Sequence, residues 1–163
     1  MSPLQSEVAA AFGKGGPLAQ ADDCHVEREV QLRMALAVAQ AIDERSALVV
    51  EAGTGVGKTF AYLVPALLSG ARTLVSTATK SLQDQLFLRD LPRLRDALRL
   101  PVSVALLKGR GSYLCLHRMD QARQSAELPD RWAVRTLAKV EQWSHVTVSG
   151  DLAELKGWMS AAA

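Results

Sequence analysis

The sequence predicts an α/β fold in which a parallel sheet is flanked by helices. Short apolar, β-branched runs alternate with longer segments of helical periodicity, an order typical of parallel sheets with right-handed crossovers. A glycine-rich turn at residues 52–59 joins one such run directly to a helix. Hydrophobic residues make up 48% of the chain and charged residues 22%, which is ordinary for a globular domain and excludes wholesale disorder.

The predicted elements begin after residue 24. Residues 1–24 contain Gly13, Gly15, Gly16 and Pro17 and show weak periodicity, so we expect a loose lead-in. From Glu27 an amphipathic helix of about four turns follows, because Val30, Met34, Ala37, Val38, Ala41 and Ile42 recur at helical spacing. The strand-like runs are residues 47–50, 73–76 and 102–107, and the helices between them are residues 60–68, 80–88 and 91–98.

Two details of these helices are predicted as well. Gly70 is placed to end the helix that contains Pro65, since glycine readily takes the left-handed conformation found after helix ends. Leu82 and Leu86 are four residues apart and should both face inward.

The strand signal stops after Lys108. Residues 113–127 and 131–143 are predicted as helices, and residues 150–163 as a tail of small residues with no closing strand. We therefore expect four parts, namely a lead-in (1–24), an incomplete sheet domain (25–107), a helical region (108–151) and a tail (152–163).

Composition excludes several classes of protein. Glu7 stands where a signal peptide has basic residues, and no apolar run is long enough to cross a membrane. Cys24 and Cys115 are too few for a disulfide framework, so we expect a cytoplasmic protein without a membrane partner. The net charge of +2 is too small to indicate nucleic-acid binding by itself.

The turn after the first strand-like run has the pattern of a P-loop, the phosphate-binding loop of many nucleotide-binding proteins. Its residues are Ala52, Gly53, Thr54, Gly55, Val56, Gly57, Lys58 and Thr59. Glycines let successive backbone N–H groups point at one phosphate, and the helix that follows adds its N-terminal partial charge. Lys58 can reach the β- and γ-phosphates and Thr59 can bind Mg²⁺, so we expect ATP and Mg²⁺ as ligands.

Beyond the P-loop, three stretches resemble the DinG/XPD family of superfamily 2 DNA helicases: VVEAGTGVGKTFAYLVPALL, LVSTATKSLQDQLFLRDLPRL and VALLKGRGSYLCLHRMDQ. The resemblance covers roughly residues 25–151, with several motifs in the family's order. It implies a RecA-like sheet domain, followed by the start of an iron–sulfur domain. It also implies an ATP-dependent DNA helicase that translocates on single-stranded DNA and separates duplexes in DNA repair or replication.

The resemblance assigns further residues. Arg28 and Gln31 match an R-x-x-Q element, in which Gln contacts the adenine edge; an amide offers the donor and acceptor that adenine N6 and N7 require. Thr77, Thr79 and Lys80 lie in a motif that contacts the backbone of single-stranded or forked DNA. Without the resemblance, Gln31 would be read as a polar helix residue and Thr79 as a helix cap. A replication or repair protein is an implied partner.

Cys115 matches the first of the four thiolates that hold a [4Fe–4S] cluster in the family. Four thiolates are the usual requirement for such a cluster, and Cys24 matches no family ligand, so we expect a cluster only in a full-length family protein. Taken without the resemblance, Cys115 would be read as a core residue.

Parts of the family's catalytic apparatus are absent from the sequence. The D-E-x-H element that holds Mg²⁺ does not occur, since Asp43-Glu44 precedes its strand-like run, and the second ATPase domain with its arginine finger is missing. An arginine finger contributes about 10³–10⁵ in rate, so the chain as given is expected to be catalytically incomplete. Two alternatives stay open, a small stand-alone P-loop protein and an inactive remnant.

Overall fold

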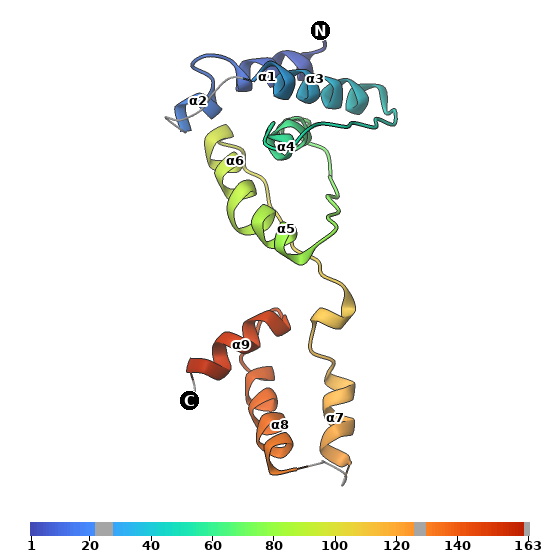
Figure 1. Cartoon of the computed structure of the whole chain (residues 1–163), viewed down its shortest axis with the longest axis vertical. Helices are drawn as coiled ribbons and strands as arrows, with labels where there is room; N and C mark the ends of the chain where they lie inside the picture. The colour runs from blue at the N-terminus through green and yellow to red at the C-terminus, as the bar shows by residue number, and fades with distance from the viewer. Residues whose placement is uncertain (22–27, 126–129, 162–163) are drawn as a thin grey trace. The chain divides into compact units, whose positions relative to one another are not determined.

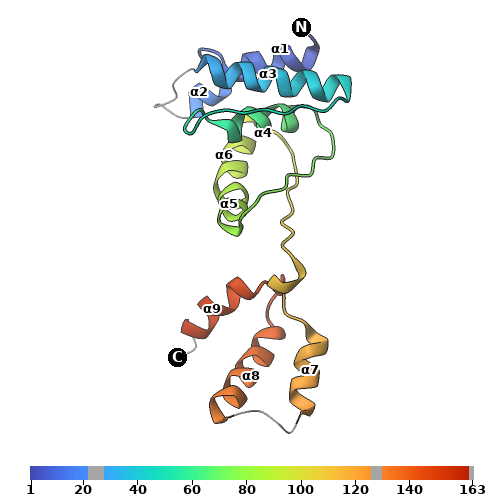
Figure 2. The same cartoon turned by 45° about the vertical axis from the view of Figure 1, so that its right-hand side comes forward.

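The computed structural model describes residues 1–21, 28–125 and 130–161. These residues divide into two compact units, Met1–Ala105 and Leu106–Ala163. No helix in the described part of the chain is long and apolar enough to cross a membrane. The elements of each unit are labelled in Figures 1 and 2.

The first unit begins with two helices where the sequence predicted a loose lead-in, so that expectation was wrong. Helix α1 (Pro3–Phe12) starts with a capping box: the Gln5 N–H donates to Ser2 Oγ and the Ser2 N–H donates to Gln5 Oε1. Helix α2 (Pro17–Ala21) follows. The buried residues of α1 are Leu4, Val8, Ala11 and Phe12. Their spacing of three to four residues is an amphipathic pattern that the glycines after it obscured.

Helix α3 (Glu29–Glu44) confirms the predicted amphipathic helix, and α1 and α4 (Lys58–Leu68) pack against it. The face that is buried, however, is Gln31, Ala35 and Ala39. The face predicted from the apolar spacing is only half-buried or exposed, and Val30 is 54% exposed.

The remaining helices of this unit agree closely with the sequence. Helix α4 runs through the buried Pro65 to Leu68, and Gly70 beyond it has a φ of +66°, as expected of a residue that ends a helix. Helix α5 (Lys80–Gln85), the π-helical turn Leu86–Asp90 and α6 (Leu91–Leu98) follow one another without a break. Leu86 is buried as predicted, but Leu82 is 47% exposed.

The three strand-like runs do not form strands among the described residues. Segments 47–50, 73–76 and 102–107 carry no ladder hydrogen bonds, and Val49, Leu74 and Leu107 are 97%, 92% and 79% exposed. A strand is stable only when a neighbour accepts and donates its backbone hydrogen bonds, and these three segments do not supply one another with such bonds. The predicted sheet is therefore not formed by the residues that the structure describes.

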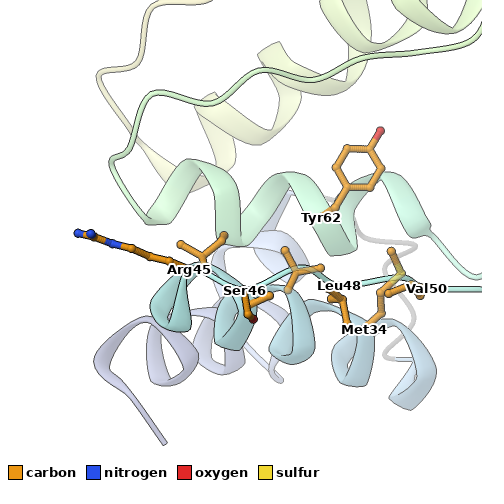
Figure 3. A pocket seen from close by; sticks show the side chains of 9 residues that line it. Met34, Arg45, Ser46, Leu48, Val50 and Tyr62 are labelled. Carbon is orange, nitrogen blue, oxygen red and sulfur yellow. The ribbon is translucent and has the colours of Figure 1, made fainter.

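An apolar hollow lies where segment 46–50 passes over α3, as Figure 3 shows. It is a cavity of about 500 Å³ lined by Met34, Val38, Ala41, Ile42, Arg45, Ser46, Leu48, Val50 and Tyr62. The α3 residues in this lining belong to the face that the apolar spacing predicted. That face is therefore directed toward the first strand-like segment.

The second unit contains a 3₁₀ turn (Arg110–Ser112) and helices α7 (Leu116–Gln124), α8 (Arg131–Ser144) and α9 (Leu152–Ala161). Helix α8 confirms the prediction for residues 131–143. Helix α7 starts three residues later than predicted, at Leu116, and residues 126–127 of that prediction lie outside the described part. The expected tail is wrong, because α9 forms there and the Asp151 carboxylate accepts the Ala153 N–H at its start.

The segment before α7 pairs with the segment before α9 in this unit. Tyr113 and Asp151 form an isolated antiparallel bridge, and the Leu114 N–H donates to the Gly150 carbonyl across 2.8 Å. The hydroxyl of Tyr113 accepts the Lys108 N–H. Helices α7 and α8 are linked by an ion pair between Arg123 and Glu141.

Candidate functional site

The glycine-rich loop connects segment 46–50 to α4 and has the backbone that phosphate binding requires. Gly55 and Gly57 have φ angles of +78° and +80°, in the left-handed region that glycine enters without steric cost. Gly57 is the N-cap residue of α4, and no side chain caps the helix. The first N–H groups of α4 are therefore available to an anion, which the helix dipole also attracts.

Lys58 lies in the first turn of α4 and its side chain folds back over the loop. Its Nζ donates to the Ala52 carbonyl across 2.8 Å and to the Gly53 carbonyl across 2.6 Å. An ammonium group gains about 1.5–3 kcal/mol from a hydrogen bond in a protein. Phosphate oxygens are stronger acceptors than carbonyls because they carry charge, so a bound triphosphate can take over these hydrogen bonds.

Thr59 is half-buried beside Lys58, and Tyr62 lies one turn further along α4. Burial raises the pKa of the Tyr62 hydroxyl, a hydrogen bond with the Thr59 side chain opposes that rise, and the charge of Asp90 adds to it. Tyr62 was not among the site residues predicted from the sequence. The available signal was its position three residues after Thr59, which places both side chains on one face of the helix.

Two side chains from the start of α3 reach the same loop. A guanidinium N–H of Arg28 donates to the Gly55 carbonyl, and the Gln31 amide donates to the Gly57 carbonyl across 3.0 Å. Gln31 is 8% exposed. The structure thus brings both members of the R-x-x-Q element onto the loop.

The other predicted site residues lie apart from this loop. Thr79 is the N-cap of α5 and accepts the Leu82 N–H, as its reading as a cap predicted. The Thr77 hydroxyl donates to the Thr79 carbonyl, and Lys80 is exposed. Among the described residues, no ion pair or hydrogen bond joins Thr77, Thr79 or Lys80 to the glycine-rich loop.

Cys115 is exposed at the N-terminus of α7, which contradicts its reading as a core residue. Cys24 lies outside the described residues. The chain contains two cysteines in all, and no cluster of three or more metal-binding side chains occurs among the residues the structure describes. A four-thiolate cluster therefore does not fit the residues of this chain.

A comparison with known protein families shows to which family the glycine-rich loop and the chain around it belong. A DEAD/DEAH box helicase family matches residues 30–146, which include the loop and α4. The chain belongs to the DEAD/DEAH box helicase family. Membership implies a P-loop NTPase fold that binds ATP with Mg²⁺, and it confirms the resemblance found in the sequence.

Curated relatives agree with this family. The chain is 48% identical over 150 residues to the ATP-dependent DNA helicase YoaA of Haemophilus influenzae and 49% identical over 145 residues to that of Escherichia coli. It is 46% identical over 151 residues to the ATP-dependent helicase DinG of Mycobacterium tuberculosis. The matches cover 92%, 86% and 79% of this chain, but only 23%, 22% and 23% of these three relatives. The chain therefore spans about a quarter of their length.

Proposed function

We propose that this chain is the N-terminal ATP-binding portion of an ATP-dependent DNA helicase. The whole protein would couple ATP hydrolysis to translocation on single-stranded DNA and to duplex unwinding in DNA repair or replication. The observation that carries the proposal is the loop with two left-handed glycines, Gly55 and Gly57, that leads into the uncapped N-terminus of α4. The names of the YoaA and DinG relatives support the step from nucleotide binding to a helicase.

In this proposal the loop from Ala52 to Gly57 receives the triphosphate. The backbone N–H groups surround the β-phosphate, and Lys58 supplies a positive charge to the β- and γ-phosphates. The Thr59 hydroxyl supplies one oxygen ligand to Mg²⁺, which keeps most of its waters. Bound Mg²⁺ neutralises charge on the phosphates, and these residues hold and orient the nucleotide.

We extend the proposal to the sheet. Segments 47–50, 73–76 and 102–107 would become parallel strands once further strands of the family's fold pair with them. Their apolar side chains suit strands that are buried on both faces, and the α3 side chains that line the hollow beneath residues 46–50 would then cover one face. The domain boundary near residue 107 belongs to the same proposal, as does the start of an iron–sulfur region after Lys108.

DNA binding is proposed for Thr77, Thr79 and Lys80. The hydroxyl of Thr79 accepts one hydrogen bond at the helix cap, but it keeps an O–H that can donate to a phosphate. Exposed Lys80 adds a positive charge next to that hydroxyl. Such contacts fix a nucleic-acid backbone without reading its bases.

The experiment is titration calorimetry of MgATP into the 163-residue chain. Lys58→Ala should weaken binding at least tenfold, because a charge-assisted contact worth about 1.5–3 kcal/mol is lost. Lys14→Ala is the matched control, since Lys14 is exposed and remote from the loop in sequence. Equal affinity of Lys58→Ala and the wild type would overturn the phosphate site.

A further inference from the structure

The first turn of α3 contacts the loop at both of its left-handed glycines. Arg28 donates to the carbonyl of Gly55, and Gln31, one turn later, donates to the carbonyl of Gly57. Arg28 is the N-cap residue of α3 and has an extended backbone, with φ −125° and ψ 111°. One helix end thus holds the two residues on which the curvature of the loop depends.

The contact between Gln31 and Gly57 is close-packed as well as polar. A β-carbon added to Gly57 would lie 2.1 Å from Gln31 Nε2 and 2.8 Å from its Cδ, far inside any non-bonded contact. The three heavy atoms nearest to that position all belong to Gln31. The absence of a side chain at Gly57 therefore serves the approach of Gln31 as well as the φ of +80°.

Because the peptide bond is planar, these contacts also fix the direction of the N–H groups on the phosphate side of the loop. A trans peptide is planar, so its C=O and the N–H of the next residue point in opposite directions. The Gly57 carbonyl also accepts the Ala61 N–H of α4 across 3.2 Å, so Gln31 adds a second hydrogen bond to it. Together the contacts at the carbonyls of Gly55 and Gly57 direct the N–H groups of Val56 and Lys58 away from α3. Those N–H groups belong to the set that a P-loop presents to a phosphate.

We propose that Arg28 and Gln31 are positioning residues that brace the P-loop in its phosphate-binding conformation, independently of which base the nucleotide carries. This inference rests on the proposed nucleotide site and adds a role to the adenine contact that the sequence resemblance implies for Gln31. Adenine recognition would direct both ends of the amide at the base, whereas here Nε2 is directed at the Gly57 carbonyl. A brace affects any ligand that carries a triphosphate.

The test compares three probes on the 163-residue chain: MgATP, MgGTP and magnesium tripolyphosphate, which has no base. We expect Gln31→Met, which keeps the volume but removes the amide, and Arg28→Met to weaken all three by a similar factor. Loss of one hydrogen bond to a positioned group corresponds to about tenfold. Arg28→Lys should restore part of the affinity, because the contact with the Gly55 carbonyl needs one N–H donor, and a lysine ammonium also supplies one.

Two controls on the same helix separate the brace from charge and from helix stability. Arg33→Met removes the same charge from an exposed position of α3, and Gln40→Met removes an amide that donates to Glu44 instead of the loop. Both should keep wild-type affinity for all three probes. Circular dichroism melting curves identify any variant that loses the fold. If Gln31→Met unfolds the chain, Arg28→Met still tests the brace, because Arg28 is exposed.

The outcomes separate this inference from the proposed function. A wild-type chain that binds none of the three probes would overturn the nucleotide site itself. If the wild type binds but Gln31→Met loses only MgATP, Gln31 reads adenine and the brace is wrong. The brace is equally wrong if Arg28→Met and Gln31→Met both bind tripolyphosphate as the wild type does.

Discussion

Lys108 and Asp151 form a buried ion pair within the second unit, with 2.7 Å between Nζ and Oδ2 and with side chains 6% and 12% exposed. The pair lies beside the Tyr113–Asp151 bridge and the hydrogen bond from Leu114 to Gly150. It therefore ties the start of the second unit to the residue that precedes α9. A charge in such a place is stable only while its partner is present.

Asp151→Asn should lower the free energy of unfolding of the second unit by about 3 kcal/mol, because it removes the charge of the Asp151 carboxylate from beside the buried Lys108 ammonium. Asparagine can still accept the Ala153 N–H, so the cap of α9 is kept. Tryptophan fluorescence during urea unfolding measures the effect, since Trp132, Trp143 and Trp158 all lie in this unit and Trp143 is 3% exposed.

Glu141→Gln is the matched control for that measurement. It breaks the ion pair between Glu141 and Arg123, whose side chains are 30% and 53% exposed. Exposed ion pairs contribute about 0–1 kcal/mol to the free energy of unfolding. A loss of stability in Asp151→Asn no larger than in Glu141→Gln would show that the buried pair does not hold the unit together.

Lys80→Ala should weaken binding of single-stranded DNA and reduce the salt dependence of that binding. Loss of one phosphate contact lowers the slope of log K against log salt by about 0.7 for single strands. Fluorescence anisotropy with oligonucleotides of two unrelated sequences should give the same loss for both, because a phosphate contact carries no sequence information. Lys14→Ala removes the same charge from another exposed lysine, and an equal effect of the two variants would point to net charge alone.

Tyr62 should ionise at higher pH in the folded chain than in the unfolded chain, because burial raises its pKa above the usual 10.0. Because the pKa of Tyr62 is higher in the folded chain, its neutral hydroxyl contributes to folding stability. That contribution is complete below the pKa that Tyr62 has in the unfolded chain. It is lost as the pH rises through the folded pKa. The Tyr113→Phe variant leaves Tyr62 as its single tyrosine, so ultraviolet absorbance follows it alone. Identical titration midpoints with and without urea would contradict the prediction.

The 163-residue chain, purified without air, should contain no stoichiometric iron–sulfur cluster, since its two cysteines cannot supply four thiolates. Exposed Cys115 should instead react readily with a thiol reagent in the folded chain. Iron analysis and thiol counting on the wild type and Cys115→Ser measure both expectations. Stoichiometric iron in the wild type would contradict the first, and equal thiol counts in the two proteins would contradict the second.

Much of the local structure could be predicted because it depends on neighbouring residues. Helix α6 has the predicted bounds, Leu91–Leu98, since Pro92 suits a first helical turn and the apolar spacing marks the rest. The loop at Gly55 and Gly57 also follows from its own residues. The two members of the R-x-x-Q element were identified, but their contacts with these two carbonyls depend on how α3 packs and were not predicted.

The errors arise where structure depends on distant partners or on a weak pattern. Helix α1 was missed because its apolar spacing is short and glycines follow it. Segments 47–50 and 73–76 have strand-like composition, but composition supplies no hydrogen-bonding partner. The pairing of Lys108 with Asp151 joins residues far apart in sequence, so spacing gave no signal for it.

The exposed apolar segments of the first unit have a consequence for the order in which this chain folds. Its helices bury a shared core that includes Val8, Leu63, Val64 and Leu94 without help from a sheet. Helices form through local contacts and therefore early, whereas parallel strands must wait for distant partners. During synthesis on the ribosome, residues 47–50, 73–76 and 102–107 would stay accessible after the helical layer has condensed. Unpaired apolar segments of this kind promote aggregation, so these three are the sites where chaperones would be needed longest.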